Sequence, residues 1–131
     1  MSFINDYNFG KEQEIKILDR VEDYFKDNIK IVKTKNSRFD YIGDKNIYEL
    51  KSRKFNYNKY PTTLITCSKV ILGKEDNLYF IFNFTDDIYY IKYNNQEFEK
   101  FEKKSFRRYR KDFNDKEENY FYIPIEKLTK I

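Results

Sequence analysis

Two short strand-like segments separated by a tight turn constrain the fold of this chain more than any other feature. The segments Arg38 to Ile42 and Asn46 to Ser52 are rich in residues that favour strands, and only Gly43-Asp44-Lys45 lies between them. Such spacing predicts a β-hairpin. A turn of this length places Ile42 directly opposite Ile47. Because side chains alternate along a strand, this register also decides which polar residues share a face.

The segments before the hairpin predict a helix and one more strand. Apolar residues recur at helical spacing from about Lys11 to Phe25, with charged residues between them. Asn28 then ends the helix, and Ile29 to Lys33 has a strand-like pattern. The apolar residues on which the helix prediction rests are Ile15, Leu18, Val21, Tyr24 and Phe25.

The segments after the hairpin are less uniform. Thr62 to Leu72 contains residues that favour a strand, but its apolar residues also fit one helical face, and we interpret most of it as a helix after a short extended entry. Two paired strands, a charged segment that is irregular or partly helical, a last strand and a short terminal helix that begins with a proline are expected to follow. Their ranges are Leu78 to Phe84, Ile88 to Tyr93, Gln96 to Asp112, Asn119 to Ile123 and Pro124 to Leu128.

This order of elements predicts an α/β fold: one domain over residues 1–131, with a central mixed sheet flanked by helices and extra strands at the C-terminal end. The chain has 131 residues, which is enough to bury a core without metal or disulfide crosslinks. Only three Gly and two Pro occur, so no linker divides the chain.

Composition narrows the chemistry that the chain can perform. The sequence has no His and one Cys, Cys67, which excludes His-based acid–base catalysis, Cys–His zinc sites and disulfides within the chain. Catalysis would therefore depend on carboxylates, lysines, tyrosines and a hard metal ion. The net charge is +4, which permits nucleic-acid binding without demonstrating it. No apolar run approaches the roughly 18 residues of a membrane span, and the N-terminus lacks a signal-peptide pattern, so we expect no membrane and an intracellular protein of the cytoplasm or nucleus.

The hairpin gathers ionisable residues on one face. In the register above, Asp40 lies opposite Glu49, and Lys51 shares the face of Glu49. Two carboxylates this close repel each other unless a positive charge lies between them, and Mg²⁺ takes one or two carboxylates readily. Lys51 could then reach the attacking water or the scissile phosphate. On spacing alone, ordinary charged residues on a solvated sheet surface are the favoured explanation. The position of the three residues on a hairpin that follows an amphipathic helix favours a functional site.

These residues resemble a known motif. Asp40 followed by Glu49-Leu50-Lys51 resembles the PD-(D/E)xK motif of the nuclease superfamily that includes many restriction endonucleases and Holliday junction resolvases. The resemblance implies a restriction endonuclease-like α-β-β-β-α-β core, which matches the predicted order from Lys11 to Phe84. It implies that Asp40, Glu49 and the Leu50 carbonyl bind Mg²⁺, or Mn²⁺ in its place, and that Lys51 positions the water. Phe39 replaces the proline of the motif.

Many members of this superfamily also place an acidic residue of the first helix in the site. Glu14 is the candidate, because it precedes Leu18, Val21 and Phe25 at steps of three or four residues. The alternative is that Glu14 only favours the helix dipole and stays solvated.

Basic residues outside the motif suggest where nucleic acid would bind. Arg53 extends the strand face of Lys51, and Lys69 lies on the next element. Seven basic residues lie between Lys100 and Lys111 with aromatic residues among them, a combination that suits phosphate contact and base stacking. The alternative is a solvated surface segment. The candidates for nucleic-acid contact are Arg53, Lys69, Arg107, Arg108 and Arg110.

The function expected from these features is a metal-dependent nuclease, with DNA preferred to RNA, acting as an endonuclease. A homodimer would suit an enzyme that cuts both strands. The second hypothesis is a non-catalytic nucleic-acid-binding module that keeps the nuclease fold. The third is a protein-interaction domain, which would show no salt-dependent affinity for DNA or RNA.

Overall fold

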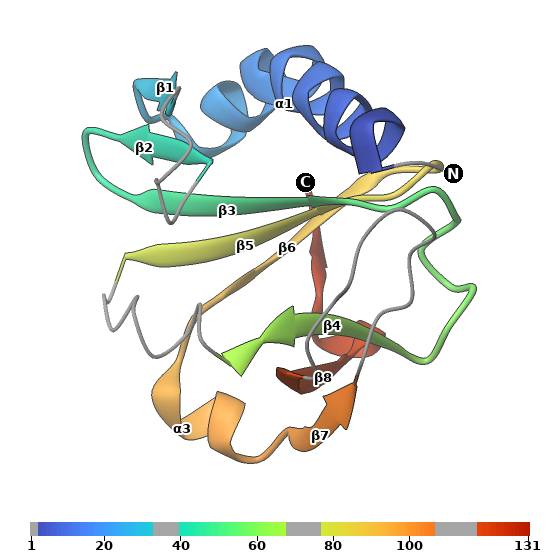
Figure 1. The fold of residues 1–131 in the computed structure, drawn as a ribbon. Helices are drawn as coiled ribbons and strands as arrows, with labels where there is room; N and C mark the ends of the chain where they lie inside the picture. The colour runs from blue at the N-terminus through green and yellow to red at the C-terminus, as the bar shows by residue number, and fades with distance from the viewer. Residues whose placement is uncertain (1–2, 33–39, 68–76, 107–117) are drawn as a thin grey trace.

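The structure is a computed structural model that describes residues 3–32, 40–67, 77–106 and 118–131. Its elements follow one another along the chain as a long helix, a series of strands and short helical segments (Figure 1). They are α1 (Phe3–Phe25), β1 (Ile29–Ile31), β2 (Tyr41–Gly43), β3 (Ile47–Ser52), β4 (Thr62–Thr66), β5 (Leu78–Asn83), β6 (Ile88–Lys92), α3 (Asn95–Glu99), β7 (Glu102–Phe106), β8 (Glu118–Pro124), the 3₁₀ helix η1 (Ile125–Lys127) and β9 (Thr129–Lys130).

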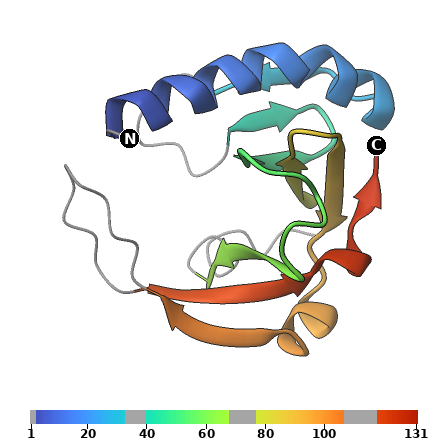
Figure 2. The same ribbon diagram turned by 90° about the vertical axis from the view of Figure 1, so that its right-hand side faces the viewer.

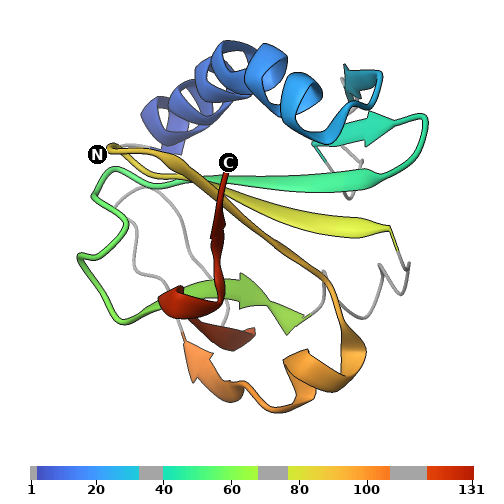
Figure 3. The same ribbon diagram turned by 180° about the vertical axis from the view of Figure 1, so that it is seen from behind.

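The strands form two sheets. The first has six strands in the order β1-β2-β3-β5-β6-β9, and the second has three in the order β4-β8-β7. Strands β3 and β5 are parallel, and the other neighbours are antiparallel. Helix α1 covers one face of the larger sheet and the smaller sheet lies on its other side (Figures 1 and 2). Near the C-terminus, β9 returns to the edge of the larger sheet beside β6 (Figure 3).

The α/β class and the mixed sheet predicted from the sequence are confirmed. Helices had been expected to flank the sheet; in the residues that the structure describes, a helix covers one face and a sheet covers the other. No helix in these ranges is long and apolar enough to cross a membrane.

Each face of the larger sheet packs into its own hydrophobic core. Tyr41, Tyr48 and Leu50 pack with the α1 residues Ile17 and Val21. The other face carries apolar side chains of β5 that pack against residues of the smaller sheet, among them Leu78, Phe80, Phe82, Ile65, Phe121 and Ile123. Strand β5 is therefore apolar on both faces, as expected of a central strand.

Helix α1 differs from the prediction in its start and in its buried face. It begins at Phe3 and not near Lys11, and its end at Phe25 agrees with the sequence. The predicted stripe included Ile15, but this side chain is 69% exposed, whereas Ile17 is buried. Steps of three and four residues from the buried Glu14 lead to Ile17 and Val21, which places Ile15 on the opposite side of the helix.

A small cluster of charged residues joins α1 to the edge of the larger sheet at which β6 pairs with β9. Asp87 follows β5, and its carboxylate lies 2.7 Å from Arg20 of α1 and 3.0 Å from Lys130 of β9. The Ile88 amide also donates to Asp87. The hydrogen bond from this amide and the one from Lys130 lower the pKa of Asp87 to about 2. One carboxylate thus connects three elements that are distant in sequence.

The short extended entry expected at the start of Thr62–Leu72 is a strand, and the helix expected after it lies mostly outside the described residues. Residues Thr62–Thr66 form strand β4, which pairs antiparallel with β8 so that Thr63 lies opposite Ile123. The β-branched residues Thr63 and Ile65 are buried and alternate with less buried neighbours, which is a strand pattern. The partner strand lies about sixty residues later, so local sequence could not reveal it. Residues 68–72 lie outside the described residues.

The later predictions are largely confirmed. Strands β5 and β6 pair antiparallel as expected, and β8 covers the predicted strand from Asn119 to Ile123. The charged segment that begins at Gln96 contains α3 and the strand β7. The terminal helix is a single 3₁₀ turn, η1, with Pro124 at its N-cap.

Candidate functional site

The β2–β3 hairpin has the register predicted from the sequence. Ile42 lies opposite Ile47 and Tyr41 lies opposite Tyr48. The Gly43 amide donates to the Asn46 carbonyl at 2.8 Å and closes the turn. The hairpin therefore has two ends with different surroundings: a turn near the end of α1, and the opposite end near Asp40.

Asp27 holds the turn end of the hairpin. Its carboxylate accepts hydrogen bonds from the Tyr48 hydroxyl at 2.8 Å and from the amides of Lys45 and Asn46 at 3.0 and 3.1 Å. Burial by itself raises the pKa of Asp27, but these hydrogen bonds outweigh it and lower the pKa. Gly43 is needed here, because an added Cβ would lie 2.0 Å from Asp27 Oδ2.

Asp27 was not among the residues predicted to matter. Its only signal in the sequence is an acidic residue directly after a helix and before a strand. The turn that it binds lies some eighteen residues later, so the pairing becomes visible only in the folded chain.

At the opposite end, Asp40 and Leu50 come together. The Leu50 amide donates to Asp40 Oδ2 at 2.8 Å. Strand β2 begins at Tyr41, just after Asp40. The Asp40 carboxylate therefore accepts a hydrogen bond from β3 of the kind that a backbone carbonyl accepts within a sheet. In an antiparallel pair the N–H and C=O of one residue point to the same side of the strand. The Leu50 carbonyl therefore also faces the side on which Asp40 lies.

Glu49 and Lys51 share the other face of β3, as predicted. They pair in register with Phe80 and Phe82 of β5, whose side chains belong to the core against the smaller sheet. Glu49 is only 4% exposed. Lys51 Nζ lies 3.4 Å from Glu49 Oε1, and the Lys51 side chain is 30% exposed. A buried carboxylate thus lies beside a cation that reaches toward solvent.

Glu14 lies on the helix side of the sheet. It is 7% exposed, and its backbone carbonyl accepts a short hydrogen bond from the Tyr41 hydroxyl. Burial raises the pKa of Tyr41, and the negative charges of Glu14 and Asp40 raise it further. Across the described ranges, no three acidic, His or Cys side chains are grouped to hold a metal ion. That Glu14 joins Asp40 and Glu49 in one site stays a prediction.

The oxygen atoms predicted to bind a metal ion are of the kind that suits a hard cation. They are the Asp40 carboxylate, the Glu49 carboxylate and the Leu50 carbonyl, and Mg²⁺ is commonly held by one or two carboxylates while water and phosphate oxygens complete its shell. The donor set therefore fits Mg²⁺ in its chemistry.

Arg53 continues the chain beyond Lys51 and connects the two sheets. Its guanidinium donates to the Leu64 carbonyl of β4 at 2.9 Å and lies 5.9 Å from the centroid of the Phe82 ring. This contact supports the packing of β4 near the end of β3. The other predicted nucleic-acid contacts, Lys69, Arg107, Arg108 and Arg110, lie outside the described residues.

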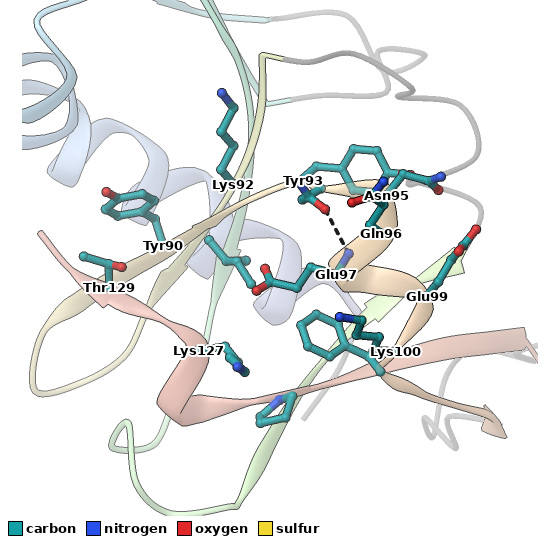
Figure 4. A pocket seen from close by; sticks show the side chains of 14 residues that line it. Tyr90, Lys92, Tyr93, Asn95, Gln96, Glu97, Glu99, Lys100, Lys127 and Thr129 are labelled. Carbon is teal, nitrogen blue, oxygen red and sulfur yellow. Dashed lines mark hydrogen bonds between the residues drawn. The ribbon is translucent and has the colours of Figure 1, made fainter.

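A separate hollow lies between β6, α3 and the C-terminal elements (Figure 4), with a cavity volume of about 1500 Å³. Its lining includes Lys92, Lys100 and Lys127 together with Glu97 and Glu99. It shares no lining residue with the hairpin site. Because both signs of charge line it, its electrostatics favour no single class of ligand.

Comparison with protein-family models, curated proteins and solved structures finds no match for this chain. The structure has an α/β fold with a mixed sheet, and Glu49 and Lys51 form an ion pair at one end of the β2–β3 hairpin.

Proposed function

We propose that this chain is a metal-dependent nuclease of the PD-(D/E)xK type that hydrolyses phosphodiester bonds, with DNA preferred to RNA. The observation that carries the proposal is the arrangement at one end of the β2–β3 hairpin. Asp40 binds the Leu50 amide there, and the next two side chains of the motif, Glu49 and Lys51, form an ion pair at 3.4 Å. Glu49, Leu50 and Lys51 belong to strand β3, and Asp40 directly precedes strand β2.

The topology supports the same proposal. A helix, three antiparallel strands and a further strand parallel to the third agree with the α-β-β-β-α-β order of a restriction endonuclease-like core, whose second helix, between the third and fourth strands, stays a prediction. Here α1, β1, β2, β3 and β5 follow that order, and α1 packs on one face of the sheet. Strand β4, which joins the second sheet, is an addition between the third and fourth core strands.

Each residue has a role in this chemistry. Asp40, Glu49 and the Leu50 carbonyl would hold Mg²⁺, which when bound lowers the pKa of a water and offsets charge on the phosphate. Lys51 lies beside Glu49 and reaches toward solvent, where its ammonium can orient the attacking water and offset charge that develops on the phosphate oxygens. Burial of Glu49 keeps its carboxylate in one position.

A direct assay tests this function. The purified protein with Mg²⁺ should hydrolyse DNA, and chelation of the metal should stop the reaction. Lys51→Ala should lower the rate by at least about a hundredfold, which corresponds to about 2.7 kcal/mol of transition-state stabilisation. Lys16→Ala is the matched control, because Lys16 is an exposed lysine of α1. Full activity in Lys51→Ala would overturn the mechanism.

One observation favours a second candidate function, a nucleic-acid-binding module without catalysis. The ion pair between Lys51 and Glu49 would also be expected if the lysine only neutralised a buried carboxylate. Calorimetry separates the two functions. The nuclease should bind Mg²⁺ and lose that binding in Asp40→Asn, whereas in a non-catalytic module Mg²⁺ should neither bind nor alter nucleic-acid affinity.

A further inference from the structure

The face of β3 that carries Glu49 and Lys51 is turned toward the second sheet and not toward open solvent. The cross-strand partners Phe80 and Phe82 pack in the core that includes Ile65 of β4. Figures 1 and 2 show the smaller sheet on this side of the larger one. A substrate phosphate must therefore approach Glu49 along the margin where the two sheets meet.

This placement discriminates between forms of nucleic acid. A Mg²⁺ ion held by Glu49 would also take phosphate oxygens, so the scissile phosphate would have to come close to the Glu49 carboxylate. Glu49 is 4% exposed. Duplex DNA is stiff over about 150 base pairs and resists sharp bending at a site. A single strand is far more flexible, and one phosphate of it can enter where a duplex cannot.

The second sheet carries a lysine on the face that is turned toward the larger sheet. Lys103 of β7 pairs in register with Phe121, and its ammonium lies 5.1 Å from the centroid of that ring. Phe121 belongs to the core between the sheets. Burial raises the pKa of the Cys67 thiol just after β4, and the positive charge of Lys103 opposes this effect. Lys103 is thus a cation on the inner side of the smaller sheet.

The next residue provides an internal comparison. Lys104 lies one position along β7, so its side chain takes the opposite face of the sheet. Its ammonium lies 2.5 Å from the Glu102 carboxylate and 5.8 Å from the centroid of the Tyr122 ring. Two exposed lysines, adjacent in sequence, therefore face opposite sides of one strand.

We propose that the substrate is a single strand of nucleic acid that reaches the hairpin site along the margin between the two sheets, with Lys103 binding one of its phosphates. The proposal rests on the nuclease function proposed above and specifies its substrate. Lys51 and Lys103, on the facing sides of the two sheets, and Arg53, at their junction, match the negative charge of the strand. Arg53 contributes from the junction of the sheets, where it donates to the Leu64 carbonyl.

Two measurements test the proposal. The first compares hydrolysis of a labelled 30-nucleotide single strand with hydrolysis of the same sequence as a blunt duplex, with Mg²⁺. We expect the single strand to be cut at least about tenfold faster, equivalent to about 1.4 kcal/mol. The second measures binding of both oligonucleotides by fluorescence anisotropy to the Glu49→Gln protein, with Lys103→Ala or Lys104→Ala added.

Lys103→Ala should weaken single-strand binding by about threefold to tenfold and reduce the logarithmic salt slope by about 0.7, the value for one phosphate contact. Lys104→Ala should change binding by less than about twofold, since its ammonium contacts Glu102 and lies on the other face. Circular dichroism confirms that both variants are folded.

The outcomes separate this inference from the function on which it rests. Equal or faster cutting of the duplex, or equal effects of the two lysine substitutions, overturns the single-strand proposal while the nuclease function stands. If neither oligonucleotide is cut, the nuclease function is overturned, and the single-strand substrate with it.

Discussion

The β2–β3 hairpin has a buried carboxylate near each of its ends, and the two are held in different ways. Asp27 is 6% exposed and Glu49 is 4% exposed, so both side chains are buried. Asp27 accepts hydrogen bonds from a tyrosine hydroxyl and two backbone amides of the turn. Glu49 lies beside the ammonium of Lys51, whose side chain is 30% exposed.

The partners of a buried carboxylate indicate whether it serves stability or activity. The donors around Asp27 are uncharged groups of the hairpin itself, so the carboxylate crosslinks α1 to the turn and contributes to folding. Glu49 instead lies beside the charged ammonium of Lys51, whose side chain is partly exposed. We therefore expect substitutions at Asp27 to change mainly stability and substitutions at Glu49 to change mainly activity.

The largest expected effect is on catalysis. Glu49→Gln preserves the shape of the side chain and removes its charge, so hydrolysis with Mg²⁺ should fall by at least about a thousandfold, or about 4 kcal/mol. The free energy of unfolding should change by less than about 1 kcal/mol, because water can solvate the partly exposed Lys51. Rates and urea unfolding measure the two quantities.

Glu99→Gln is the control, since Glu99 is exposed on α3. If Glu49→Gln unfolded the protein and left the specific rate of the folded fraction unchanged, Glu49 would be a structural residue like Asp27.

The next effect is steric and belongs to the turn end. Gly43→Ala would place a Cβ 2.0 Å from Asp27 Oδ2, so the carboxylate or the strand must move. We expect a loss of about 3 kcal/mol in unfolding free energy, at the upper end for overpacking, with hydrolysis by the folded protein retained.

A double-mutant cycle provides the control for this clash. Gly43→Ala should cost less in an Asp27→Ser background, because the shorter side chain leaves room for the methyl group. Equal costs in both backgrounds would show that the contact with Asp27 does not explain the need for glycine.

The smallest effect comes from the charge of Asp27. Asp27→Asn replaces one acceptor oxygen by an NH₂ group that faces donors, and should lower the unfolding free energy by about 1–2 kcal/mol at neutral pH. Asp23→Asn, on the exposed face of α1, should have little effect. A larger loss of activity than of stability in Asp27→Asn would contradict the distinction between the two ends.

The dependence of this effect on pH has a definite sign. The pKa of Asp27 is lower in the folded protein than its ordinary value of 3.8, so its stabilisation is fully present above that value and is lost as the pH falls through the folded pKa. The free energies of unfolding of the unsubstituted protein and of Asp27→Asn, measured from pH 7 to pH 2, should therefore converge in acid. A difference that stayed constant with pH would mean that the charge of Asp27 contributes nothing.

Much of the hairpin could be predicted from the sequence, because the information is local. The turn residues and the alternation on each side place Ile42 opposite Ile47, and the same register puts Glu49 and Lys51 on one face. The strand β4 could not be predicted in the same way. Thr62–Thr66 is compatible with either a strand or a helix, and pairing with β8 near the other end of the chain decides between them.

The end of helix α1 and the register of the hairpin follow from the amino-acid sequence, because each depends on residues within a few positions. The absence of histidine chemistry follows from composition alone. Only the tertiary structure decided that Asp27 binds the turn and that the face of Glu49 and Lys51 is covered by a second sheet. These contacts join segments separated by eighteen residues or more. These contacts form because of burial and long-range hydrogen bonds, and a local sequence pattern predicts neither.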